Sequence, residues 1–86
     1  MPEISRFYGI IIRMYYREHG APHFHAEAAG EFASFSIDEV RLMEGSVSRR
    51  AEHLVVEWAQ QHQAVLRDDW ERARSARPLM KIAPLD

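Results

Sequence analysis

The chain has no cysteine among its 86 residues, so disulfide frameworks, thiolate zinc fingers and cysteine nucleophiles are all excluded. It also lacks any apolar run close to the roughly 18 residues that a membrane-spanning helix requires. The first residues, "MPEISRFYG", do not combine a basic segment with an apolar one, as a secretory signal would. We therefore expect a cytoplasmic protein with no membrane association.

Several catalytic signatures are missing as well. The sequence contains no GxGxxG nucleotide loop, no GxSxG nucleophile elbow and no HExxH zinc-protease helix. Its net charge of −2 excludes a polycation that coats nucleic acid. What remains is typical of one globular domain over residues 1–86, and its small core makes a protein partner or a homodimer a reasonable expectation.

Strand patterns fill the first half of the chain. Aromatic and β-branched residues dominate the segment 6–16, which we predict to be one strand. Arg13 and Tyr15 share one side of it, opposite Ile12 and Met14. A further short strand is expected at 40–43.

The segments 23–28 and 31–38 alternate strictly between apolar and polar residues, and Ala29-Gly30 between them suits a tight hairpin. A two-residue loop would pair apolar with apolar and polar with polar positions. The predicted pairs are Phe24–Phe35, Ala26–Ala33, His25–Ser34 and His23–Ser36. Residues 1–45 are thus predicted to form an antiparallel meander of three or four strands.

From Ser48, a plausible N-cap, apolar residues recur at helical spacing as far as Trp70. One continuous helix would be too long for so small a domain. We therefore predict two helices within 46–76 with a bend near Gln63, then an extended tail over 77–86. Strands followed by helices imply an α+β fold whose antiparallel sheet is covered on one face by the two C-terminal helices.

The stretch "HGAPHFHA" (19–26) holds three of the five histidines. On a strand, His23 and His25 point to the same side, which we expect to be the solvent side, away from the tryptophans. Such a pair suits zinc or another divalent metal if a third ligand is near. His19 is the first candidate for that ligand, and Glu27 and Asp38 are alternatives.

The same face permits an interpretation that needs no cofactor. His23 and His25 would act as general acid and base, and Arg13 would hold a phosphate of RNA. Tyr15 would stack on a base or donate a proton. If the protein is an enzyme, this predicts a metal-independent ribonuclease. A plain solvent-exposed sheet face explains the histidines without any function.

Two other surfaces are candidates for binding. Arg49 and Arg50 lie at the positive end of a predicted helix, an unfavourable place for cations, and are candidates for contact with an anion or nucleic acid. The apolar residues of the tail are Leu79, Ile82 and Leu85. We predict that they dock on a protein partner or a second copy, which would make the chain a non-enzymatic interaction module.

The segments "RFYGIIIRMYY", "PHFHA" and "EWA" with "WERAR" resemble those of a family of small bacterial proteins, Domain of Unknown Function 4160. The family has no established activity. The resemblance implies a partner encoded by a neighbouring gene, in an arrangement similar to toxin–antitoxin pairs. The leading interpretation is therefore a toxin–antitoxin-like component that acts through a protein partner, with RNA as its candidate target.

Overall fold

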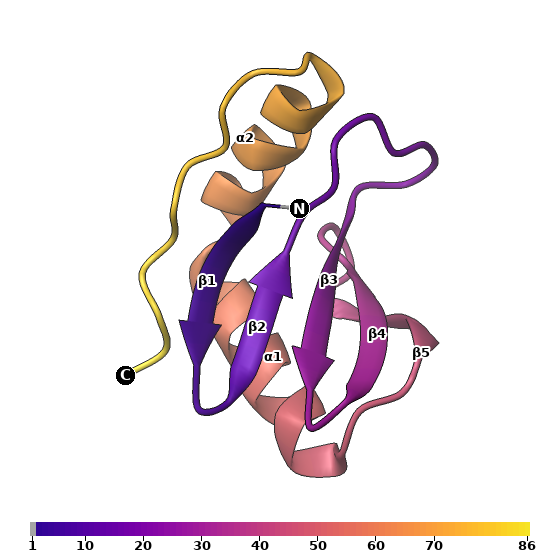
Figure 1. Ribbon diagram of the computed structural model, residues 1–86, viewed down its shortest axis with the longest axis vertical. Coiled ribbons are helices and arrows are strands. Elements are labelled where there is room, and N and C mark those ends of the chain that lie inside the picture. The colour runs from indigo at the N-terminus through magenta and orange to yellow at the C-terminus, as the bar shows by residue number, and fades with distance from the viewer. Residues whose placement is uncertain (1) are drawn as a thin grey trace.

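The computed structural model describes residues 2–86. Its elements in chain order are β1 (Glu3–Phe7), β2 (Ile10–Arg13), β3 (His23–Ala28), β4 (Glu31–Ser36), β5 (Arg41–Gly45), α1 (Arg49–Gln61) and α2 (Gln63–Arg74). The strands form one antiparallel sheet in the order β1-β2-β3-β4-β5, and both helices lie against one face of it (Figure 1). The predicted α+β fold is confirmed, with five strands in place of three or four.

The additional strand arises in the segment 6–16, which we predicted to be a single strand. The chain instead reverses at Tyr8 and Gly9, whose φ angles are 50° and 77°. Two consecutive residues with positive φ form a tight turn whose twist matches that of the strands it joins. The prediction was wrong because Gly9 is the only turn signal in an otherwise continuous aromatic and β-branched run.

The predicted register of the β3–β4 hairpin is confirmed at every pair. Phe24 lies opposite Phe35 and His25 lies opposite Ser34, and the other two predicted pairs are also observed. The β2–β3 register places Arg13 opposite His25. The buried apolar members of these strands, such as Ile12, Phe24 and Phe35, face the helices, and the outer face of the sheet carries mainly polar residues together with Ile11 and Phe32.

The helices begin and bend where the sequence predicts. The Ser48 side-chain oxygen accepts a hydrogen bond of 3.1 Å from the Ala51 N–H, which caps α1. The chain leaves helical geometry at His62, between α1 and α2. The largest fully buried side chains come from both layers, and they include Trp58, Phe24, Phe35, Ile12, Val55 and Leu66. Within residues 2–86, no helix is long and apolar enough to cross a membrane.

The tail after α2 runs alongside β1 (Figure 1). The Ile82 N–H donates a hydrogen bond of 2.8 Å to the carbonyl oxygen of Ile4, and the Trp58 indole N–H donates one of 2.8 Å to Ala83. Ile82 and Leu85 are only 6% and 8% exposed, while Leu79 is half-buried. Two of the three residues that we expected to dock on a partner thus fill this chain's own core, and docking through them would require the tail to leave it.

Candidate functional site

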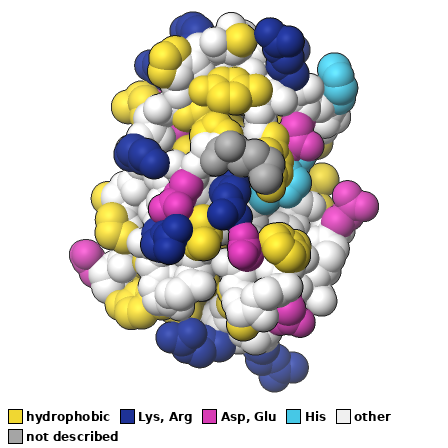
Figure 2. All heavy atoms as spheres, in the orientation of Figure 1, with side chains coloured by type: hydrophobic (Ala, Val, Ile, Leu, Met, Phe, Trp, Pro, Cys, Tyr) yellow, Lys and Arg dark blue, Asp and Glu magenta, His cyan; other side chains and the backbone are white. Residues whose placement is uncertain are grey.

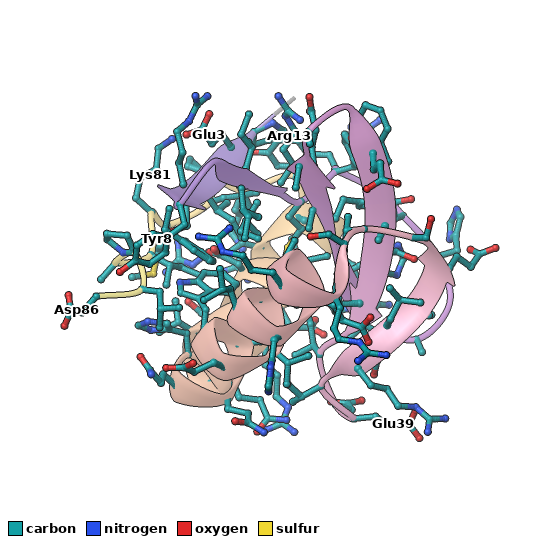
Figure 3. All side chains as sticks on the ribbon, turned by 90° about the horizontal axis from the view of Figure 1, so that it is seen from below. Glu3, Tyr8, Arg13, Glu39, Lys81 and Asp86 are labelled. Atoms are coloured by element: carbon teal, nitrogen blue, oxygen red, sulfur yellow. The ribbon has the colours of Figure 1, made fainter. Side chains whose placement is uncertain are left out.

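The outer face of the sheet brings together the residues that the sequence singled out. The rings of His23 and His25 lie 5.2 Å apart, edge to face, because alternate residues of β3 point the same way. Tyr15 follows β2 and packs edge-on against His25, with ring centroids 4.4 Å apart. Arg13, opposite His25, projects from the face of the sheet away from the helices (Figure 3).

The loop between β2 and β3 adds a residue that the sequence analysis did not select, Glu18. One of its carboxylate oxygens, Oε1, lies 3.1 Å from His23 Nε2 and 2.7 Å from His25 Nε2. The loop is held in place because the Arg17 N–H donates a hydrogen bond of 3.3 Å to the Ala73 carbonyl at the end of α2. A single carboxylate oxygen therefore bridges the two imidazoles.

His23 is fixed from both sides. Its Nδ1 lies 2.9 Å from the carbonyl oxygen of Ala21, so both ring nitrogens face oxygen acceptors. Its ring also packs on Trp70 of α2 at 5.0 Å. We expected both imidazoles to lie away from the tryptophans, and for His23 this was wrong, because Trp70 on α2 reaches its ring. The contact limits the motion of His23, whose side chain is 12% exposed, against 29% for His25.

The ligand atoms of Glu18, His23 and His25 all lie within 4.8 Å of one another. The residues that we considered as a third ligand are elsewhere: His19 is exposed and outside this group, and Glu27 is paired with Arg13. Glu18 was missed because its place depends on the path of the loop. The only signal in the sequence is an acidic residue five positions before His23.

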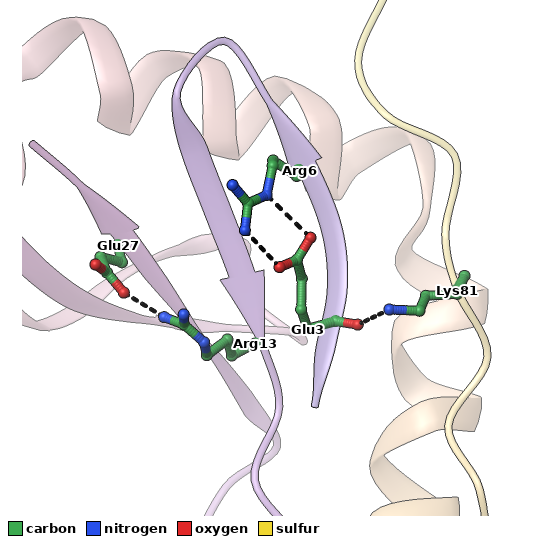
Figure 4. Close-up of polar contacts among 5 residues, drawn as sticks. All are labelled: Glu3, Arg6, Arg13, Glu27 and Lys81. Atoms are coloured by element: carbon green, nitrogen blue, oxygen red, sulfur yellow. Dashed lines mark hydrogen bonds and ion pairs between the residues drawn. The ribbon is translucent and has the colours of Figure 1, made fainter. Parts of the chain in front are cut away.

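Charged side chains of both signs gather on the outer face beside the cluster (Figure 2). Arg13 Nη1 donates to Glu27 Oε1, and the Arg6 guanidinium makes two bonds to Glu3, of 3.1 and 2.8 Å (Figure 4). The hydrogen bonds from Arg6 lower the pKa of Glu3 from its ordinary value, and its positive charge acts in the same direction. Arg13 is thus paired with a carboxylate. The role that we predicted for it, holding a phosphate of RNA, needs a guanidinium that is free.

Residues 9–71 match the family described as "Domain of unknown function (DUF4160)". The matched range runs from the β1–β2 turn into α2 and includes Glu18, His23 and His25. The chain belongs to the DUF4160 family. The resemblance noted from the sequence is therefore confirmed. No curated protein and no solved structure shows a significant match to the chain.

The two arginines at the start of α1 are separate from the cluster in this DUF4160 protein. Arg49 and Arg50 are exposed in the first turn, at the end of the sheet away from the β2–β3 loop (Figure 1). Neither forms an ion pair with another residue in the range 2–86. Their contact with an anion or nucleic acid stays a prediction.

Proposed function

We propose that this DUF4160 protein binds a divalent transition metal, with zinc as the first candidate, through Glu18, His23 and His25. The observation that carries the proposal is the convergence of three ligand atoms within 4.8 Å. Two imidazoles and one carboxylate form a ligand set that suits zinc and its first-row neighbours. Calcium and magnesium, which prefer oxygen ligands alone, should bind poorly.

The spacing of the ligand atoms supports the proposal. In a tetrahedral zinc site with bonds of about 2.0–2.1 Å, neighbouring ligand atoms lie about 3.3 Å apart. Glu18 Oε1 lies 3.1 Å from His23 Nε2 and 2.7 Å from His25 Nε2. The Glu18 oxygen is therefore already near the spacing of a coordinating ligand from both imidazoles.

The partner of the second His23 nitrogen supports it further. Histidines that bind metals usually donate their other ring N–H to a carbonyl or carboxylate, which fixes the tautomer and the ring orientation. The Ala21 carbonyl lies 2.9 Å from His23 Nδ1 and is placed to accept that bond. With Nδ1 protonated in this way, the Nε2 lone pair is free to face the metal.

The same contacts define the metal-free state. Both Nε2 atoms face the Glu18 carboxylate and must carry protons to donate to it. A metal needs the unprotonated Nε2 lone pair of each imidazole, and we therefore expect affinity to weaken as the pH falls.

Three protein ligands leave a fourth position for water or a bound group. The Glu18 and His25 side chains are 31% and 29% exposed, so this position is reached from solvent. A closed structural zinc site would use four protein ligands. We therefore infer that the metal serves to hold an exchangeable ligand.

Calorimetric titration of EDTA-treated protein with zinc tests the proposal. Titration in two buffers of different ionisation enthalpy gives the affinity and the number of protons released. We expect one site per chain, micromolar or tighter, and release of about one proton. His23→Ala and His25→Ala should each weaken binding by more than about 10-fold, and Glu18→Gln should weaken it as well.

His19→Ala is the matched control, because His19 is an exposed histidine of the same loop outside the cluster. It should bind zinc as the unaltered chain does. The proposal would be overturned if no saturable binding were seen at micromolar zinc. It would also be overturned if His19→Ala lost as much zinc affinity as His23→Ala or His25→Ala, since that would indicate adventitious binding by surface histidines.

A ribonuclease without metal is less well supported. Glu18 lies between the two histidines that would exchange protons, and Glu27 occupies Arg13. For this function to hold, the unaltered chain would have to cleave RNA in EDTA, and the double variant His23→Ala/His25→Ala would have to lose that activity. A toxin–antitoxin-like role through a protein partner stays a prediction from the resemblance alone.

A further inference from the structure

A hollow of about 230 Å³ opens on the outer face of the sheet beside His25. It is lined by Ile11, Arg13, Tyr15, His25, Ala26, Glu27 and Phe32. Sites for drug-sized ligands usually measure about 300–1,000 Å³, so this hollow suits a single flat ring system. His25 belongs both to the hollow and to the proposed metal site, so a ligand in one is next to the other.

Phe32 is the residue of the hollow that the fold does not explain. It lies on β4 in line with the polar Ser34 and Ser36, and it is 62% exposed, the most of any large hydrophobic residue in the range 2–86. Tyr15 provides a second aromatic ring in the same lining. Exposed aromatic rings on an open sheet face are the surfaces on which proteins stack bases of single-stranded nucleic acids.

The ion pair in the hollow supplies polar groups of both kinds. The Arg13 guanidinium donates hydrogen bonds and the Glu27 carboxylate accepts them, side by side. The Watson–Crick edge of guanine presents the O6 acceptor beside the N1–H and N2–H donors, so O6 would accept from a remaining N–H of Arg13 and the two donors would bond the Glu27 carboxylate. Because guanine offers the carboxylate two donors where adenine offers one, its edge matches the pair better than that of adenine.

Cationic groups lie on the other side of the cluster. Arg17 and Arg74 line a second hollow together with Glu18 and His19. The phosphate of a nucleotide whose base lies beside His25 would thus be near the proposed metal, with the two arginines close to Glu18. This part of the argument rests on the proposed metal site, whereas the ring and edge contacts do not.

We propose that the hollow beside His25 binds a nucleobase, guanine by preference, and presents its phosphate to the cluster of Glu18, His23 and His25. The base comes either from a free nucleotide or from a single-stranded nucleic acid. Titration of the full chain with guanosine, guanosine monophosphate and a short guanine-containing single strand, each with and without zinc, tests the proposal and distinguishes the sources.

Guanosine should bind equally with and without zinc, and more tightly than adenosine. Guanosine monophosphate should bind more tightly with zinc than without it. Phe32→Ala should weaken the binding of guanosine and of guanosine monophosphate by about 5-fold or more. Glu27→Gln should reduce the preference for guanosine over adenosine. Met43→Ala is the control, because Met43 is an exposed hydrophobic residue of β5 outside the lining, and it should change nothing.

The outcomes separate this proposal from the metal site. Zinc binding without binding of any guanine probe overturns the nucleobase site and leaves the metal site intact. If the chain binds guanosine but does not bind zinc, the nucleobase site is supported and the proposed metal site is overturned. Binding of the single strand alone supports the base contacts with nucleic acid as their source, and binding unaffected by Phe32→Ala overturns the assignment to this hollow.

Discussion

The two faces of β3 use alternate residues of one strand for opposite purposes. On the inner face, Phe24 stacks on Phe35 at 5.5 Å and meets Trp58 edge-on at 5.7 Å. On the outer face, His23 and His25 share one oxygen of Glu18. Inner contacts are apolar and remove surface from water, which stabilises the fold. Outer contacts are polar and partly solvated, so they contribute little to folding and stay available to a ligand.

Two carboxylates show the same division. Asp69 of α2 is fully buried, and its Oδ1 accepts a hydrogen bond of 2.8 Å from the Met80 N–H of the tail. Its Oδ2 has no partner among the residues that the structure describes. Burial raises the pKa of Asp69 from its ordinary value, and the bond from Met80 opposes this. Glu18, by contrast, is partly exposed and bridges two imidazoles, so only Asp69 carries an uncompensated burial cost.

Phe24→Ala should have the largest effect of the changes considered. Removing a fully buried aromatic side chain leaves a cavity between the sheet and α1, and such substitutions cost about 3–5 kcal/mol of unfolding free energy. Urea denaturation followed by tryptophan fluorescence measures the loss. A change below about 1 kcal/mol would contradict the assignment of this face to the core.

Ile82→Ala tests whether the tail belongs to the inner face. Ile82 is buried against β1, so we expect a loss of about 2–4 kcal/mol. Met80→Ala, two residues earlier, is the control, because Met80 is 44% exposed and its loss should be small. If both substitutions were neutral, the tail would be free to dock elsewhere, as the sequence alone suggested.

The register of the sheet could be predicted because side chains alternate with period two. A shift by one residue between β3 and β4 would place Phe24 opposite Ser34 or Ser36, so the apolar pattern permits one pairing. The reversal at Tyr8-Gly9 could not be predicted in the same way, since the run of aromatic and β-branched residues continues on both sides of the turn. The burial of Ile82 could not be predicted either, because the apolar residues of an extended tail give no sign of whether they pack on this chain or on a partner.

The candidate site could be predicted only as far as one strand determines it. The spacing of His23 and His25 on β3 places their rings together whatever the loops do. Glu18 reaches them through the loop conformation and through the bond from Arg17 to Ala73, a contact between residues far apart in the chain. Such a contact leaves no local pattern in the sequence.

The pH dependence of the stability of Asp69→Asn tests the contrast between the buried carboxylate of Asp69 and the partly exposed one of Glu18. Because the folded-state pKa of Asp69 is raised, the folded chain binds a proton that the unfolded chain releases. Its contribution to stability is therefore full below the ordinary value of 3.8 and is lost as the pH rises through the raised folded-state pKa. The difference in unfolding free energy between the unaltered chain and Asp69→Asn should shift in favour of the unaltered chain as the pH falls through this window. A difference that is constant with pH would contradict the raised pKa.

His25→Ala should have the smallest effect on the metal-free protein, within about 1 kcal/mol, because a partly exposed hydrogen bond contributes little net free energy. With zinc at about 100 times its dissociation constant, the unaltered chain should gain about 2.7 kcal/mol and the variant close to nothing. His19→Ala should gain as much as the unaltered chain, and thermal unfolding with and without zinc measures all three. A metal-free loss as large as that of Phe24→Ala would mean that the outer cluster holds the sheet together, and the division between a face for folding and a face for binding would then be wrong.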